Sequence, residues 1–252
     1  MRIENSFIPV EGVGETTERR LWEAGVTTWD DFGGDVVGDR TAARIREFVD
    51  TARGRLREGD ARYFRETFPS GTHWRCYADF REAACFLDIE TTGLDQRRDD
   101  VTVVSCHRGG ETTTLVADRD LTAERLQREL DAANLLVTFN GKRFDVPFLE
   151  TAFDVTVEAP HVDLMYPCRR LGLTGGLKTI EREVGIDRDR PDLSGEDAVR
   201  LWREYRRGDD RALETLVSYN RDDTENMRTL MELVADRLEP DPLADGTPAP
   251  DV

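Results

Sequence analysis

Four carboxylates and one phenol are carried by three short segments, and together they suit the hydrolysis of a phosphodiester bond. Asp88 and Glu90 follow an apolar run, and residues two apart in a strand point to the same face. Carboxylate oxygens are preferred ligands of hard divalent cations such as Mg²⁺ and Mn²⁺. Two such ions about 4 Å apart can activate water and stabilise the leaving oxygen of a phosphate ester.

The remaining carboxylates and the phenol lie where the pattern becomes helical. Asp145 stands where an apolar strand gives way, through Asn-Gly, to a helical stretch. Tyr219 precedes Asp223 by four residues in a long helical segment, so both lie on nearly the same helix face. Asp222 is a neighbouring alternative to Asp223. The sequence therefore predicts one metal site with oxygen ligands, and no Cys or His cluster competes for a softer metal.

The three segments resemble the exonuclease motifs of the DEDDy 3′-5′ exonucleases, within the ribonuclease H-like superfamily. The matching residues are Asp-Ile-Glu-Thr-Thr-Gly-Leu, Phe-Asn-Gly-x-x-Phe-Asp and Tyr-x-x-x-Asp, in this order. Residues 161–164 and 176–180 resemble segments of the YprB-like branch. The alternative subclass carries His where this chain has Ser218, which favours the Tyr version. The resemblance covers residues 83–232 and implies an α/β fold, a mixed five-stranded sheet flanked by helices.

The resemblance also implies a role for each matching residue. Tyr219 would orient or deprotonate the attacking water. Asp163 would be a carboxylate that supports the metal ligands without binding the ions itself. Leu94 would act as an apolar wedge under the last base, and Phe144 would stack on a base. The ligands of two ions, Mg²⁺ or Mn²⁺, would be Asp88, Glu90, Asp145 and Asp223. The residues that contact the substrate would be Thr91, Leu94, Asn140, Phe144 and Lys178.

Each of these residues has a simpler explanation when it is taken alone. An Asp-x-Glu at a strand end is usually a solvated turn, and Asp145 suits a helix N-terminus. Tyr219 suits half-buried packing, and Asp163 or Lys178 suits a surface salt bridge. Their conjunction in the right order favours a 3′-5′ exonuclease acting on nucleic acid, with single-stranded DNA preferred over RNA. The alternatives are a non-catalytic nucleic-acid-binding adaptor, or an RNA exonuclease or endonuclease on the same scaffold.

The elements that must position these residues follow the order expected of a ribonuclease H-like domain, here residues 83–238. Apolar or β-branched stretches predict strands, and the segments between and after them are expected to be helical. The expected strands cover 84–89, 101–106, 112–117 and 135–139. The expected helices cover 122–132, 146–153, 177–184, 195–207 and 209–236.

The first 60 residues predict a small helical domain. Gly12 and Gly14 precede a helical stretch, and the segment resembles a helix-hairpin-helix unit, in which backbone N–H groups bind a DNA phosphate. A tight turn between packed helices is an equal alternative. Residues 61–82 are expected to form a connector whose aromatic side chains pack on the next domain. The tail 239–252, which contains four prolines, is expected to be disordered.

The composition predicts an acidic surface with few lysines. The chain of 252 residues has a formal charge of −17, and its 35 basic residues comprise 2 Lys and 33 Arg. This is typical of a protein that works in concentrated salt, where self-repulsion is screened; a GC-rich genome also favours Arg. Acidity disfavours binding to phosphates in general, but bound metal ions would neutralise part of the carboxylate charge.

The cysteines and the apolar runs bear on the location of the protein. Four scattered cysteines without metal-ligand spacing predict free thiols in a reducing interior. No apolar run approaches the length of a membrane span, and the first residues lack the apolar core of a signal peptide. A cytoplasmic location with no membrane partner is therefore expected.

Overall fold

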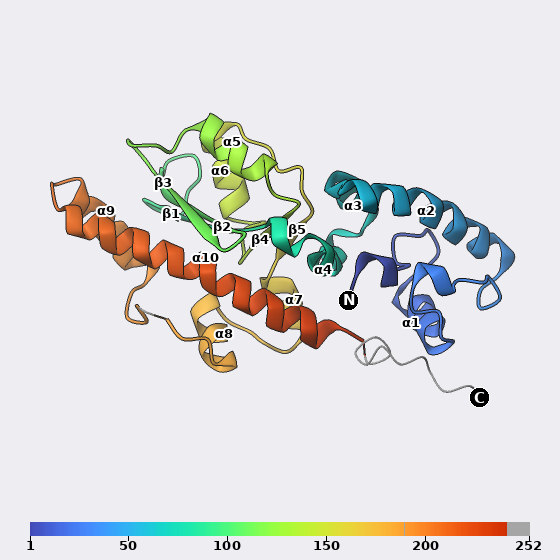
Figure 1. The fold of residues 1–252 in the computed structure, drawn as a ribbon. Helices are drawn as coiled ribbons and strands as arrows, with labels where there is room; N and C mark the ends of the chain where they lie inside the picture. The colour runs from blue at the N-terminus through green and yellow to red at the C-terminus, as the bar shows by residue number, and fades with distance from the viewer. Residues whose placement is uncertain (189, 241–252) are drawn as a thin grey trace.

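The computed structural model describes residues 1–188 and 190–240, and its centre is one mixed five-stranded sheet. The strand order is β3-β2-β1-β4-β5 (Figure 1). The pairs β1/β2 and β2/β3 are antiparallel, whereas β1/β4 and β4/β5 are parallel. This confirms the predicted fold class. The strands are β1 Ala84–Thr91, β2 Val101–Arg108, β3 Glu111–Val116, β4 Leu135–Thr138 and β5 His161–Asp163.

Helices cover both faces of the sheet, α5 and α6 on one side and α10 on the other (Figure 1). The buried side chains of β1 alternate between the two layers, as a period of two requires. Leu87 packs with Leu126 of α5, whereas Phe86 packs with Leu230 of α10. Asp88 and Glu90 share the parity of Phe86, so they lie on the α10 face. The helices after β3 are α5 Ala123–Asp131, α6 Asp145–Phe153, α7 Met165–Arg170, α8 Leu177–Val184, α9 Gly195–Tyr205 and α10 Asp210–Leu238.

Helix α10 is the longest element and carries the third motif. Its 29 residues begin after Asp209, whose side chain accepts a hydrogen bond from the Arg211 N–H and caps the helix. Its buried stripe is apolar at both ends and polar in the middle, at Tyr219, Asn220 and Asp223. A polar interruption in a buried apolar stripe must be satisfied by partners or by bound cations, so it points to a site.

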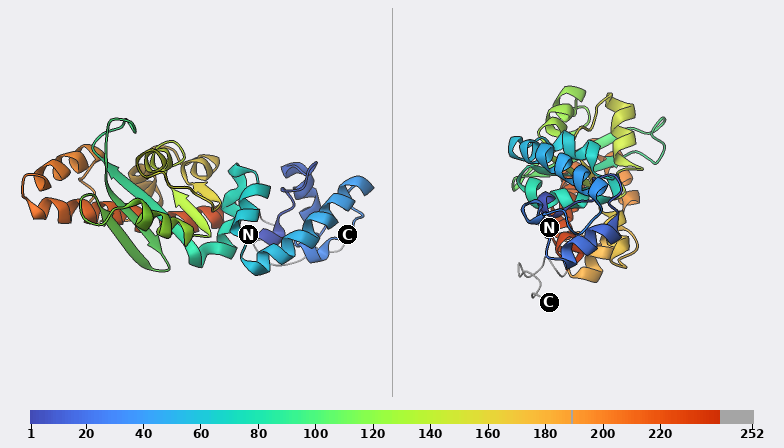
Figure 2. Two further views of the ribbon diagram at one scale, coloured as in Figure 1. Left: turned by 90° about the horizontal axis from the view of Figure 1, so that it is seen from above. Right: turned by 90° about the vertical axis from the view of Figure 1, so that its right-hand side faces the viewer.

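The N-terminal region is helical, as predicted, and its core is continuous with that of the sheet. Phe7 and Leu21 belong to the same buried cluster as Trp74 and Phe86. Residues 61–82, expected to be a connector, form short helices whose Trp74, Tyr77 and Phe80 are buried. Figure 2 shows the helices of residues 15–58 at one end of an elongated molecule, with the helices of residues 61–82 between them and the sheet. The elements are α1 Glu15–Glu23, α2 Asp39–Glu58, α3 Ala61–Thr67 and α4 Tyr77–Phe80, with 3₁₀ turns at Ile3–Asn5, Trp29–Asp31, Ser70–Cys76 and Arg81–Ala83.

A buried ion pair joins α1 to the 3₁₀ turn Ser70–Cys76. The Arg75 guanidinium contacts the Glu18 carboxylate at 2.5 Å, and the Glu18 side chain is fully buried. The same carboxylate accepts hydrogen bonds from the Ser6 hydroxyl at 3.0 Å and from the Phe7 N–H at 2.7 Å. A buried charge with this many donors is stable only in the assembled structure. The pair therefore ties the N-terminal region to the segment that precedes β1.

The glycine turn before α1 has the conformation that glycine favours. Gly12 has a φ of 91°, and the Val13 N–H donates to the Val10 carbonyl at 2.9 Å. Gly14 is the extended N-cap of α1, and a 3₁₀ turn at Ile3–Asn5 is the preceding helical element. A turn of this conformation is compatible with both alternatives, a tight turn between packed helices and a contact with a DNA phosphate.

Three other predictions concern the cysteines, the membrane and the tail. Cys76, Cys85, Cys106 and Cys168 are all buried free thiols, as expected. Within residues 1–188 and 190–240, none of the helices is both long and apolar enough to cross a bilayer. Of the tail predicted to be disordered, residues 241–252 lie outside the described residues.

Candidate active site

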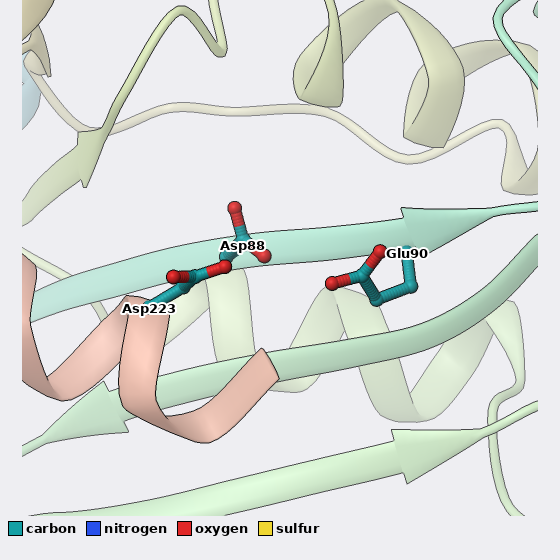
Figure 3. A group of neighbouring side chains, drawn as sticks. All are labelled: Asp88, Glu90 and Asp223. Carbon is teal, nitrogen blue, oxygen red and sulfur yellow. The ribbon is translucent and has the colours of Figure 1, made fainter. Parts of the chain in front are cut away.

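Three of the four predicted carboxylates meet between β1 and α10. One oxygen from each of Asp88, Glu90 and Asp223 lies within 4.8 Å of the others. Figure 3 shows Asp88 and Glu90 projecting from β1 toward Asp223 on α10. The strand ends at Thr91 and the helix begins at Asp210, far along the chain, so the tertiary fold creates this cluster. Three oxygen ligands at this spacing suit a hard divalent cation.

Asp145 lies outside this group of three close carboxylates and interacts with them electrostatically from the other layer of the sheet. It is the first residue of α6, its side chain is buried, and it accepts a hydrogen bond from the Ile89 backbone. Its charge raises the pKa of Glu90, and the charge of Asp88 raises the pKa of Asp145. Interactions of this kind require proximity in a medium of low dielectric constant. The charge of Asp145 is therefore felt at Asp88 and Glu90, whereas close approach of the oxygens is limited to Asp88, Glu90 and Asp223.

Burial is the main reason why these carboxyl groups resist ionisation. It raises the pKa of Asp88 to about 7, although a 2.7 Å hydrogen bond from the Asn220 side-chain amide acts in the opposite direction. Burial also raises the pKa of Glu90, and the charges of Asp88 and Asp145 raise it further. Buried like charges of this type need cations close by. The all-oxygen donor set and the mutual repulsion therefore fit divalent metal ions.

The metal-free protein is expected to be more stable at pH 5 than at pH 8. The pKa of Asp88 is about 7 in the folded state and 3.8 ordinarily, so the folded state binds more protons between these values. The stabilising effect is full below the ordinary pKa and is lost as the pH rises to about 7. Thermal unfolding in chelator should show a melting temperature several °C higher at pH 5.

Two controls separate this effect from the acidity of the surface. Asp88→Asn should flatten the pH profile, and saturating Mg²⁺ should raise stability most at pH 8, where the carboxylates are ionised. A profile that Asp88→Asn leaves unchanged would argue against a raised pKa at this residue.

Tyr219 lies one helical turn before Asp223 and is buried. Burial first, and then the charges of Glu90 and Asp88, raise the pKa of its phenol. The phenol is therefore un-ionised at neutral pH in the metal-free site, which favours orienting a water molecule over deprotonating it. The Lys178 ammonium lies 4.3 Å from the centre of the Tyr219 ring, within cation–π distance.

Arg188 is a site residue that the sequence did not reveal. Its guanidinium contacts the Asp223 carboxylate and donates to Glu181 Oε2 at 2.7 Å, and its side chain is only 5% exposed. It lies in the loop after α8, where neither periodicity nor a motif marks it. Because the Arg188 guanidinium pairs with Asp223, it would compete with a metal ion for that ligand.

Arg188→Gln is therefore expected to tighten divalent-metal binding several-fold. The variant removes the competing guanidinium and leaves the carboxylates of Asp223 and Glu181 in place. Isothermal titration with Mn²⁺ provides the measurement, and Arg182→Gln, which changes an exposed residue of α8, is the matched control. Weaker Mn²⁺ binding by Arg188→Gln would contradict this competition.

Comparison with known proteins identifies the domain that contains this site. A profile of the RNase_H superfamily matches residues 85–235, which is more than half of the chain. The chain belongs to the RNase_H superfamily. All four carboxylates and Tyr219 fall within the matched range.

A solved DNA polymerase structure shares the fold of this RNase_H superfamily domain. The family B DNA polymerase from the hyperthermophilic archaeon Pyrobaculum calidifontis is 19% identical with a TM-score of 0.51, over 61% of this chain and 24% of that chain. The matched part of this chain thus spans about a quarter of the polymerase. Brucella melitensis NrnC is 20% identical with a TM-score of 0.35, over 64% of this chain and 86% of that chain. No curated protein matches the chain.

Thr91 and Leu94 lie at the end of β1 in the RNase_H superfamily domain, where an ordered loop begins. The Thr91 side chain is buried, and its hydroxyl donates to the Gly93 carbonyl at 2.5 Å. The Asp99 carboxylate accepts from the Asp95 N–H at 2.9 Å and closes the loop. Leu94 is 85% exposed, an unusual state for a large apolar side chain. The loop therefore presents Leu94 to solvent, as a wedge residue requires, whereas Thr91 stabilises the turn.

Asn140 and Asp163 are joined by a hydrogen bond that shapes the second motif. Asn140 has a φ of 64°, a left-handed conformation that Asn tolerates better than most residues. Its N–H donates to Asp163 Oδ1 at 2.7 Å, and the Lys142 N–H donates to Asp163 Oδ2 at 3.1 Å. Gly141 leaves no room for a side chain against Thr138. Asp163 is thus buried as an anchor for the turn that leads into Asp145.

Phe144 and Lys178 are held by contacts of their own. The Phe144 ring lies 4.9 Å from that of Phe148 and packs against the α5–α6 side of the core. The Lys178 ammonium donates to the Leu193 carbonyl. Phe144 therefore packs against the core, and Lys178 lies over the Tyr219 ring.

Proposed function

We propose that this chain is a metal-dependent exonuclease that removes nucleotides from the 3′ end of a nucleic-acid strand. The observation that supports this best is the convergence of the three motif carboxylates Asp88, Glu90 and Asp223 within 4.8 Å. Asp145 is electrostatically coupled to them, and Tyr219 lies one turn from Asp223. The motif resemblance supplies the direction of cleavage, 3′ to 5′.

The carboxylates would hold two divalent ions, Mg²⁺ or Mn²⁺. Bound ions would supply a nucleophilic water at neutral pH and stabilise the charge of the leaving oxygen. The ligands would be Asp88, Glu90, Asp145 and Asp223. Asn220 positions Asp88 through its 2.7 Å hydrogen bond, so this ligand is oriented before a metal arrives.

The proposed substrate is single-stranded DNA in preference to RNA. Leu94 would lie under the terminal base, Phe144 would stack on a base, and Thr91, Asn140 and Lys178 would contact the terminal nucleotide. The turn at Gly12 and Gly14 would contact the DNA backbone away from the site. Asp163 would act indirectly, by anchoring the Asn140 turn.

An end-labelled substrate assay tests this function. Purified protein is incubated with 5′-labelled and with 3′-labelled single strands of DNA and of RNA, with Mg²⁺ or Mn²⁺ and high salt. Release of labelled mononucleotide from the 3′ label, with a ladder from the 5′ label, supports the exonuclease. Retardation without shortening would instead indicate an adaptor, and a discrete internal product would indicate an endonuclease.

Tyr219→Phe is expected to lower the cleavage rate by roughly 10²-fold. The substitution removes the hydroxyl and keeps the ring, which lies 4.3 Å from the Lys178 ammonium. Single-turnover rates with saturating Mg²⁺ provide the measurement, and Mn²⁺ titration checks that metal binding persists. Tyr205→Phe, on α9, is the matched control. A rate equal to that of the unmodified protein would exclude a role for the phenol in the reaction.

A further inference from the structure

A pocket of about 510 Å³ lies beside the second motif, between the RNase_H superfamily domain and the segment that precedes it. Its walls include Lys142 from the turn before α6, and Tyr166 and Arg170 from α7. Ser70 and Trp74 of the 3₁₀ turn Ser70–Cys76 complete it. The pocket therefore depends on residues outside the matched superfamily range of 85–235.

The pocket adjoins the candidate active site through the chain itself. Lys142 precedes Asp145 by three residues, so their Cα atoms are at most about 11 Å apart. A strand covers this distance in about three nucleotides at a rise of 3.4 Å each. Asp163 lines the pocket and also binds the Asn140 and Lys142 N–H groups. A strand with its 3′ end at the carboxylates would therefore reach the pocket within a few nucleotides.

The charge of the pocket is opposite to that of the chain as a whole. Lys142 is one of only two lysines in a chain of net charge −17. Arg170 is half exposed, and its guanidinium forms an ion pair with the Glu15 carboxylate at 3.1 Å. In the described part of the chain, no carboxylate lies within ion-pair distance of Lys142, whose ammonium donates to the Ser70 carbonyl at 3.3 Å. The Asp163 carboxylate already accepts hydrogen bonds from backbone N–H groups. The pocket thus offers the Lys142 ammonium to an anionic ligand, and the half-exposed Arg170 guanidinium adds a second positive charge that is shared with Glu15.

Two aromatic side chains give the pocket the means to hold a base. Tyr166 is 37% exposed, and it is one of the two large apolar side chains that are exposed in the described residues; the other is Leu94. Trp74 is 5% exposed, and its indole N–H has no hydrogen-bond partner among the described residues. A buried donor without an acceptor is destabilising, and a ligand oxygen would relieve it. Exposed aromatics beside cations are typical of sites that bind single strands without sequence preference.

We propose that this pocket binds the nucleic-acid strand a few nucleotides upstream of its 3′ end. Lys142 and Arg170 contact backbone phosphates, Tyr166 stacks on a base, and the Trp74 indole donates to an oxygen of the strand. The inference rests on the proposed function, because the active site sets where the 3′ end lies. It assigns to the segment before β1 a direct part in holding the substrate.

Equilibrium binding of a 5′-fluorescent eight-nucleotide single strand, measured by anisotropy in chelator at several salt concentrations, tests the pocket without requiring cleavage. Lys142→Gln and Arg170→Gln should each reduce the slope of log K against log salt by about 0.7. Tyr166→Ala should weaken binding about tenfold with the slope unchanged, and Tyr166→Phe should retain binding. Arg169→Gln, which changes an exposed neighbour on α7, is the matched control.

Cleavage adds a second readout that separates this inference from the function itself. For an active enzyme, Tyr166→Ala should lower the ratio of kcat/KM for the eight-nucleotide strand to kcat/KM for a dinucleotide about tenfold. If the chain binds strands but never cleaves them, the proposed function fails while the binding results still decide the pocket. The pocket assignment is overturned if Tyr166→Ala and Lys142→Gln bind the strand as the unmodified protein does. It is also overturned if Arg169→Gln weakens binding of the strand as much as Arg170→Gln does.

Discussion

Asp223→Asn is expected to reduce metal-dependent cleavage by at least about 10³-fold, since a metal site contributes several kcal/mol to the transition state. Asp223 supplies one of the three oxygens that lie within 4.8 Å of one another. An asparagine is close in size and can still accept a hydrogen bond from Arg188, so the buried site stays filled. The loss should therefore appear in metal binding and in rate, with little change in folding.

Asp222→Asn is the sharpest control for this prediction, because it changes the neighbouring carboxylate of the same helix. Asp222 lies outside the cluster of close carboxylate oxygens in the described residues. Its substitution should leave the rate within about threefold, an effect under 1 kcal/mol. The measurements are initial rates of strand shortening, Mn²⁺ titration and thermal unfolding for both variants. Equal losses in the two variants would show that the sequence spacing had selected the wrong carboxylate.

Arg75→Met is expected to lower the free energy of unfolding by about 3–5 kcal/mol. The substitution leaves the Glu18 carboxylate fully buried without the cation that contacts it at 2.5 Å. The remaining donors, the Ser6 hydroxyl and the backbone of Phe7 and Ile8, cannot neutralise the charge. Because the pair joins α1 to the segment before β1, the loss should extend beyond the N-terminal helices.

Urea denaturation followed by tryptophan fluorescence measures this loss of stability. Two further variants show whether the loss comes from the buried charge. Arg44→Met breaks an ion pair with Glu11, whose side chain is 82% exposed, and should cost less than about 1 kcal/mol. Adding Glu18→Gln to Arg75→Met should recover part of the stability, because it removes the uncompensated charge. If Arg75→Met lowered the free energy of unfolding as little as Arg44→Met, the buried pair would not hold the N-terminal region in place.

The elements of the superfamily domain could largely be predicted from local patterns. The apolar run in 84–89 and the helical pattern over 209–236 correspond to β1 and α10. Both patterns depend on residues close in the chain, so they can be recognised without the fold. β5 has only three residues, and its pairing with β4 is non-local, so no local pattern marked it as a strand.

The sequence by itself determined which residues can act as oxygen ligands and that Asp88 and Glu90 share one face of β1, because side-chain direction in a strand follows from its period of two. Only the tertiary structure decided that Asp223 approaches them, that Arg188 pairs with it, and that Trp74 helps to form a pocket beside Lys142. Such contacts join segments that are far apart in the chain. Their geometry depends on how the sheet and α10 pack together, and no short-range pattern encodes it.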